Sequence, residues 1–169
     1  MDDEKRLIAQ EAPHLRRFAV ALTRDADRAD DLVQDALERA LRKHRSWRQT
    51  GSLRSWLFKI LYRTYLNGQQ RRRLERDSAE QLKRDASTTT PANQDGRVEV
   101  LNVAAAIEYL PADQREVVLL CGLEGLSYDE AAYVTGVRVG TVKSRLYRGR
   151  EALYTLRHGE GARDLRRAR

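Results

Sequence analysis

The chain of 169 residues carries 32 Lys and Arg against 25 Asp and Glu, which gives a net charge of +7 with neutral histidine. This length fits one domain or two small ones, and no stretch approaches the ~20 apolar residues that a membrane-spanning helix needs. The acidic start at Met1–Glu4 differs from the basic beginning of a signal peptide, so we expect a cytoplasmic protein. The single Cys121, expected to be a buried structural thiol, excludes an internal disulfide, and the three histidines lack metal-ligand spacing. We therefore expect no metal and no cofactor.

Charge is segregated along the chain. The counts of basic and acidic side chains are seven and ten in residues 1–40, eleven and one in 42–76, three and four in 77–97, one and seven in 98–130, and ten and three in 138–169. Two basic blocks, each preceded by an acidic one, suit a polyanion such as nucleic acid, because each neutralised phosphate releases counterions. Two solvated charged faces are the alternative interpretation.

Apolar residues recur with helical period in the first half of the chain. One stripe begins at Leu15 and ends at Leu22, a second runs from Leu32 to Leu41, and a third begins near Leu53 and continues into the Arg71–Arg73 run. Between residues 77 and 97 this periodicity is lost, and a Ser-Thr-Pro segment indicates a flexible linker. The sequence therefore predicts a helical domain over residues 1–76 and a linker over residues 77–97.

Helical patterns return after the linker. Residues 98–110 form an apolar stripe, Pro111 suits the first turn of a second helix that ends at Gly122–Gly125, and Ser127 with Glu130 forms a capping-box pattern that opens a third helix. No alternating strand pattern of useful length is present. We predict an all-α protein of two small helical domains, the second over residues 98–169.

Residues 127–150 have the spacing of a helix-turn-helix. Such a motif needs a small residue where the helices cross, a residue that tolerates positive φ at the turn and an apolar residue under the second helix, here Ala132, Gly136 and Val142. Thr135 departs from the apolar residue expected before Gly136. The second helix presents side chains that can contact bases and phosphates, namely Arg138, Thr141, Lys143, Ser144, Arg145, Tyr147 and Arg148. An ordinary helical hairpin with a basic face is the alternative.

Aromatic residues are concentrated in the first basic block. Trp47, Trp56, Phe58, Tyr62 and Tyr65 lie among its cations. Cations that follow the backbone and rings that receive unstacked bases suit single-stranded nucleic acid. Trp56, Phe58 and Tyr65 could also be core residues, whereas Trp47 lies in a polar loop and is the better candidate for a base contact.

Several motifs together resemble the bacterial extracytoplasmic-function (ECF) sigma factors of the sigma-70 family. The resemblance covers nearly the whole chain outside the linker and the C-terminal tail. It depends on Asp31-Leu32-Val33-Gln34-Asp35, Trp56-Leu57-Phe58-Lys59-Ile60, Leu110-Pro111, Gly125-Leu126-Ser127-Tyr128-Asp129-Glu130 and Val139-Gly140-Thr141-Val142-Lys143-Ser144-Arg145-Leu146. It implies a transcription initiation factor, not an enzyme, with region 2 at residues 1–76 and region 4 at residues 98–169.

The resemblance also implies partners and contact residues. The partners are core RNA polymerase through its clamp and flap, promoter DNA and an anti-sigma factor, with no small-molecule substrate and no insertion into the membrane. The polymerase clamp would be bound by Asp31, Leu32, Gln34, Asp35 and Glu38. The -10 element would be opened and held by Ser46, Trp47, Arg48, Gln49, Thr50, Trp56, Lys59, Tyr62 and Arg63. The -35 element would be read by Arg138, Thr141, Lys143, Ser144, Arg145, Tyr147 and Arg148.

This chain departs from the family pattern at Tyr62-Arg63, where members commonly carry an asparagine that contributes to the -10 pocket. The base preference of that pocket therefore stays open. Two rival hypotheses are an autonomous helix-turn-helix regulator, which leaves the aromatic basic block without a role, and a sigma mimic that titrates an anti-sigma factor without touching DNA. An enzyme is least favoured, because the chain has no P-loop, no zinc-protease motif and no cysteine pair.

Overall fold

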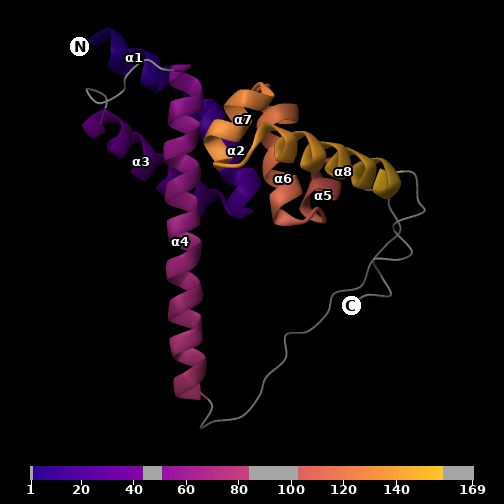
Figure 1. Ribbon diagram of the computed structural model, residues 1–169. Helices are drawn as coiled ribbons and strands as arrows, with labels where there is room; N and C mark the ends of the chain where they lie inside the picture. The colour runs from indigo at the N-terminus through magenta and orange to yellow at the C-terminus, as the bar shows by residue number, and fades with distance from the viewer. Residues whose placement is uncertain (1, 44–50, 84–102, 158–169) are drawn as a thin grey trace.

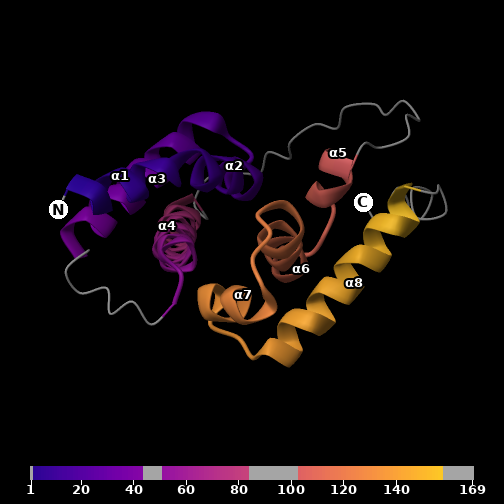
Figure 2. The same cartoon turned by 90° about the horizontal axis from the view of Figure 1, so that it is seen from above.

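The computed structural model describes residues 2–43, 51–83 and 103–157, and these residues form helices joined by short turns. Figure 2 shows α4 between α1–α3 on one side and the α5–α8 group on the other. In chain order the elements are α1 (Asp2–Gln10), α2 (Ala12–Thr23), α3 (Ala26–Lys43), α4 (Leu53–Lys83), α5 (Val103–Glu108), α6 (Ala112–Val118), the π-helical turn η2 (Leu119–Leu123), α7 (Tyr128–Thr135) and α8 (Val139–Arg157). The prediction of an all-α fold is confirmed.

The N-terminal unit, α1–α4, is held by the predicted apolar stripes. Leu15 and Phe18 of α2 and Leu57 and Phe58 of α4 are all at most 1% exposed, and the Phe18 and Phe58 ring centroids lie 5.3 Å apart. A tilted aromatic pair of this kind adds about 0.5–1.5 kcal/mol to the area that it buries. Phe58 is therefore a core residue rather than a base contact. Helix α1 was not anticipated from the apolar stripes.

Helix α4 is longer than the sequence pattern indicated. It runs over 31 residues to Lys83, so residues 77–83 of the predicted linker are helical, while residues 84–97 lie outside the described part of the chain. Its C-terminal part projects away from the other helices (Figure 1), and every described residue from 73 to 78 is exposed. An apolar stripe is absent there because there is no neighbour to pack against, whereas Ala, Glu, Gln, Leu and Lys still favour the helical backbone.

The C-terminal unit, α5–α8, is assembled where α8 crosses α6. Val117 of α6 and Val142 of α8 are fully buried, and Gly149 of α8 is buried against Val118 and Gln114 of α6. A Cβ atom placed on Gly149 would lie 2.6 Å from Val118 Cγ2. The absence of a side chain at position 149 therefore sets how closely the two helices approach.

Gly149→Ala is expected to lower the free energy of unfolding by about 1–3 kcal/mol, because the added methyl group overpacks the α6–α8 contact and outweighs the gain in helix propensity. Gly140→Ala is the matched control in the same helix, where a Cβ would meet nothing within 4 Å. It should leave stability unchanged or slightly higher. Urea denaturation of both variants tests this, and equal stabilities would contradict the proposed close packing.

Candidate nucleic-acid interface

The predicted helix-turn-helix is formed by α7 and α8. Ser127 caps α7 with its hydroxyl accepting from the Glu130 amide at 3.2 Å, while the Glu130 carboxylate accepts from the Ser127 amide at 2.9 Å. Gly136 ends α7 with φ +75°, the left-handed conformation that favours glycine. Ala132 and Val142 are 9% and 0% exposed, as the crossing of the two helices requires. The geometry predicted from the spacing is confirmed.

Helix α8 turns a basic face toward solvent. Lys143, Ser144 and Arg148 are exposed, Tyr147 is 67% exposed, and Val142 and Leu146 point into the core. Arg148 donates from Nε to the Ser144 carbonyl oxygen at 3.3 Å and from Nη2 to the Ser144 hydroxyl at 3.5 Å. Of the other predicted -35 residues, Arg138 is exposed and Thr141 is half-buried. The predicted residues therefore share one surface apart from Arg145.

Arg145 is already engaged by a neighbouring carboxylate. Its Nε lies 3.2 Å from Asp113 Oδ2, and its side chain is 23% exposed. This contact engages Nε, so a base contact from Arg145 would have to come from its Nη groups or compete with Asp113. Lys143 and Arg148 are exposed and are therefore the more accessible candidates for DNA contacts.

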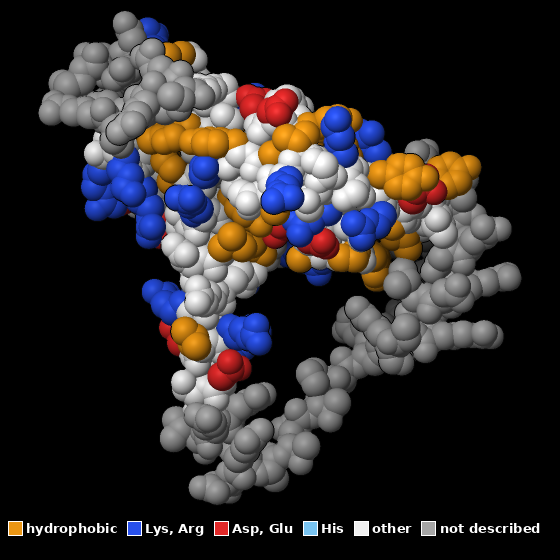
Figure 3. Space-filling view, in the orientation of Figure 1, with side chains coloured by type: hydrophobic (Ala, Val, Ile, Leu, Met, Phe, Trp, Pro, Cys, Tyr) orange, Lys and Arg blue, Asp and Glu red, His pale blue; other side chains and the backbone are white. Residues whose placement is uncertain are grey.

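A second basic surface surrounds a pocket of about 420 Å³ between α3, α4 and α7. Figure 3 shows Lys and Arg side chains grouped around the upper part of α4, next to patches of hydrophobic side chains. The pocket combines four cations with two aromatic rings and has no carboxylate in its lining: Arg39, Lys43, Trp56, Lys59, Ile60, Arg63, Thr64, Asn67 and Tyr133. Trp56, Lys59 and Arg63 of the predicted -10 set are thus brought together.

Lys59 is the most constrained of these cations. Its Nζ lies 3.5 Å from the centroid of the Tyr133 ring. Partial burial lowers the pKa of Lys59, and the nearby Arg63 guanidinium lowers it further. An anion in the pocket would relieve both effects, because it would compensate the positive charge that burial and Arg63 disfavour.

The structure places Tyr62, a predicted -10 residue, against α6 and not in the pocket. Its side chain is 6% exposed, and its hydroxyl donates to Glu116 Oε2 of α6 at 2.6 Å, so it does not line the pocket. The position of Tyr62 in the basic block did not reveal this hydrogen bond, because Glu116 lies 54 residues away in the sequence. Five further members of the predicted -10 set lie outside the described residues, namely Ser46, Trp47, Arg48, Gln49 and Thr50.

Helix α3 carries the predicted polymerase-binding residues. Asp31, Gln34, Asp35 and Glu38 are all exposed, and Gln34 Nε2 donates to Glu38 Oε1 at 3.2 Å. Leu32 is different, because it is 9% exposed and packs in the core of the N-terminal unit. The structure therefore corrects the prediction for Leu32 and leaves an acidic, polar face for a partner.

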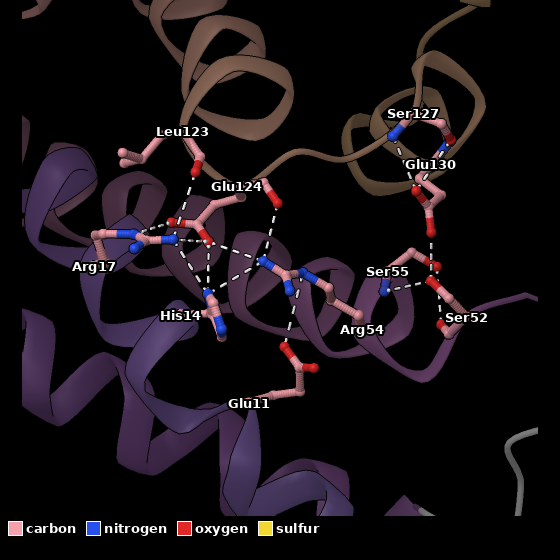
Figure 4. Close-up of polar contacts among 10 residues, drawn as sticks. All are labelled: Glu11, His14, Arg17, Ser52, Arg54, Ser55, Leu123, Glu124, Ser127 and Glu130. Atoms are coloured by element: carbon pink, nitrogen blue, oxygen red, sulfur yellow. Dashed lines mark hydrogen bonds and ion pairs between the residues drawn. The ribbon is translucent and has the colours of Figure 1, made fainter.

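The two units meet through a carboxylate that the sequence did not single out. The Glu124 side chain has no solvent exposure, and its oxygens accept from Arg17 Nε at 2.8 Å and from Arg54 Nη2 at 3.2 Å (Figure 4). His14 Nδ1 lies 3.3 Å from Glu124 Oε2. Glu124 follows the turn η2, whereas its three partners belong to α2 and α4. We call these four residues the Glu124 clamp.

Glu116 is the second buried carboxyl at this contact, and burial raises its pKa, against the opposing effects of the Tyr62 hydrogen bond and of Arg145. The unfolded chain releases this proton near 4.5, whereas the folded chain keeps it to higher pH. Between pH 4.5 and the higher pKa of the folded chain, folding is coupled to the uptake of a proton by Glu116. The contribution of Glu116 to the free energy of unfolding therefore falls as pH rises above 4.5.

Glu116→Gln keeps an acceptor for Tyr62 and cannot ionise. Its stability relative to the native chain should rise with pH, by at most about 1.4 kcal/mol per pH unit within that window. Urea denaturation between pH 4.5 and pH 8 measures the difference. Parallel curves for the two chains would show that Glu116 titrates normally.

The free thiol and possible metal ligands were also considered in the sequence. Cys121 is half-buried rather than fully buried, and burial raises the pKa of its thiol, with Arg150 opposing the rise. In the part of the chain that the structure describes, no group of three or more His, Cys, Asp or Glu side chains could hold a metal ion. No described helix is long and apolar enough to cross a membrane.

Comparisons with known proteins match both helical units. The family model described as the Sigma2 domain of PhyR matches residues 8–62, and that for sigma-70 region 4 matches residues 101–153. The chain is 40% identical over 157 residues to the ECF RNA polymerase sigma factor EcfG of Rhodopseudomonas palustris (strain TIE-1), covering 93% of this chain and 86% of that protein. The chain belongs to the ECF RNA polymerase sigma factors. The family resemblance noted in the sequence is confirmed.

Other relatives of this ECF sigma factor agree. It is 33% identical to the ECF RNA polymerase sigma-E factor of Haemophilus influenzae, covering 89% of this chain and 87% of that protein. The sigma factor RpoE of Bartonella quintana, solved in complex with the anti-sigma factor NepR, superimposes with a TM-score of 0.71 at 35% identity, over 92% of this chain and 97% of that one. CnrH, solved in complex with the cytosolic domain of CnrY, has a TM-score of 0.63 at 27% identity, over 89% and 84% of the two chains.

Proposed function

We propose how this ECF sigma factor divides its work among three surfaces. It is a transcription initiation factor that binds core RNA polymerase and directs it to promoters. The basic face of α8 reads the -35 element, the pocket between α3 and α4 receives unstacked bases of the -10 element, and the acidic face of α3 binds the polymerase clamp. We assign region 2 to α1–α4 and region 4 to α5–α8.

One observation carries this assignment. Two basic surfaces of different chemistry are present, one on the helix-turn-helix and the other around Trp56, Lys59 and Arg63 of α4. An exposed helix can enter the major groove of a duplex, whereas a pocket with rings and cations suits bases that have left the stack. A protein that acts on duplex DNA alone needs the first surface and has no use for the second.

The remaining roles follow from this division. Bond formation in the transcript belongs to the polymerase, so the sigma factor needs no catalytic residue or cofactor of its own. We place its action in the cytoplasm, where bacterial polymerase meets promoter DNA. An anti-sigma factor is an expected partner, since the sigma factor RpoE of Bartonella quintana was solved with the anti-sigma factor NepR.

Transcription with purified components tests this function. Sigma-free core polymerase, a genomic library of promoter templates and the purified chain should yield run-off transcripts from a restricted set of promoters. Core polymerase without the chain is the control. Tight duplex binding without polymerase, together with no promoter-specific transcript, would favour the autonomous regulator. No DNA binding in any form would favour the sigma mimic.

A further inference from the structure

Region 4 lies directly on the side of α4 that carries the proposed -10 residues. Helix α7 packs against α4, and polar contacts mark the start and the middle of this boundary. Ser52, just before α4, donates from Oγ to Glu130 Oε1 at 2.5 Å, and further along the helix Tyr62 donates to Glu116 at 2.6 Å. Region 2 therefore buries part of its basic helix against its own partner domain.

Tyr133 brings this contact into the pocket itself. The other lining residues belong to α3 and α4, whereas Tyr133 is the part of the wall that region 4 supplies. Its ring lies over Lys59 Nζ at 3.5 Å, which is the arrangement of a cation on an aromatic face. An unstacked base presents the same kind of flat π face to a cation. Tyr133 thus stands where a DNA base would find Lys59.

The Glu124 clamp fixes this placement. Glu124 has no exposed side-chain surface, and Arg54 binds it twice, through the carboxylate at 3.2 Å and through the backbone carbonyl at 2.9 Å. Arg17 adds two hydrogen bonds at 2.8 and 2.9 Å. Figure 4 shows the cations converging on Glu124 from region 2. Removing these cations would leave a buried, unpaired carboxylate, which is strongly disfavoured. The ion pairs of Glu124 therefore stabilise the contact between region 4 and region 2.

We propose that region 4 covers part of the -10 surface of region 2 while the sigma factor is not bound to polymerase. Tyr133 covers Lys59 at the wall of the base-binding pocket, the Glu124 clamp holds region 4 in place, and single-stranded DNA competes with Tyr133 for Lys59. This inference rests on the proposed role of the pocket in -10 binding.

Binding of single-stranded DNA by the full chain without polymerase tests Tyr133. A fluorescein-labelled oligothymidylate of twelve nucleotides serves as the probe, read by anisotropy. Tyr133→Ala should bind this probe about two- to fivefold more tightly, the gain expected from removing one cation–π competitor. Tyr109→Ala is the control, because Tyr109 is 48% exposed against 41% for Tyr133 and does not line the pocket. It should bind as the native chain does.

The clamp is tested by Glu124→Gln, which keeps the volume of the side chain and removes its charge. This variant should bind the probe roughly tenfold more tightly, as expected if one buried charge pair worth about 1.4 kcal/mol holds the clamp. Its radius of gyration in small-angle X-ray scattering should exceed that of the native chain. Glu151→Gln, a change of the same kind at an exposed position of α8, should alter neither measurement. Circular dichroism confirms that each variant is folded.

The outcomes separate this inference from the proposed function. If Tyr133→Ala binds the probe equally or more weakly, Tyr133 is no competitor and the inference is overturned, even when the native chain directs promoter-specific transcription. A native chain that already scatters as two separated domains would overturn it as well, and this measurement does not depend on whether Glu124→Gln folds. Tighter binding by both variants supports the covered pocket, and the transcription assay then decides its role independently.

Discussion

The double variant Lys143→Ala, Arg148→Ala is expected to bind duplex -35 DNA roughly a hundredfold more weakly than the native chain, since each lost base or phosphate contact costs about 1–3 kcal/mol. Both side chains are exposed on the outer face of α8. Neither contributes to the buried core, so stability should change by less than about 0.5 kcal/mol per site. The loss would therefore report on recognition rather than on folding.

Anisotropy on a promoter fragment obtained from the run-off experiment measures this effect. Binding should be recorded across a series of salt concentrations, because each lost phosphate contact lowers the salt dependence by about one unit of slope. Arg73→Ala with Arg76→Ala is the matched control, since it removes the same charge from the exposed part of α4. Equal losses in the two double variants would indicate a general electrostatic effect and contradict -35 recognition by α8.

The second large effect is expected from Asp31→Ala combined with Gln34→Ala on α3. Both side chains are exposed. The loss of two contacts at a protein–protein interface is expected to weaken the affinity for core polymerase roughly ten- to a hundredfold. Binding of -35 duplex by the same variant should stay unchanged, because α8 is untouched. This difference defines the division of labour between the two faces.

A competition assay with labelled native chain on sigma-free core polymerase measures the affinity. Asp27→Ala is the control on the same helix, one turn earlier and outside the predicted contact set. A double variant that loses polymerase and DNA binding to the same extent would refute separate surfaces. One that retains full polymerase affinity would remove α3 from the clamp interface.

Features that are local in the chain were predicted well. The capping box at Ser127 and Glu130, the left-handed turn at Gly136 and the inward Val142 all follow from spacing within about fifteen residues, and the structure has each of them. The apolar stripes of α2 and α3 likewise give the core, except that Leu41 at the end of the α3 stripe is 39% exposed. In these cases the backbone geometry needed by the motif restricts which residue can stand at each position.

Features that depend on distant partners were not predictable from patterns. Tyr62 looked like a member of an aromatic basic surface, and only the fold brings Glu116 to its hydroxyl. Glu124 gave no signal, because a single carboxylate beside a glycine is ordinary and its partners lie 70 and 107 residues away. Leu32 was assigned to the polymerase through its motif, although its place on the apolar stripe already matched the core.

The exposed face of α8 and the covered side of α4 differ in their accessibility to DNA. In the folded chain Lys143 and Arg148 reach solvent, whereas Lys59 is roofed by Tyr133. Lys143 and Arg148 can therefore meet duplex DNA in the arrangement that the structure shows, without a movement of region 4. Under our proposal that Tyr133 competes with DNA bases for Lys59, the capture of an unstacked base requires such a movement, so that duplex recognition and base capture can be separate steps.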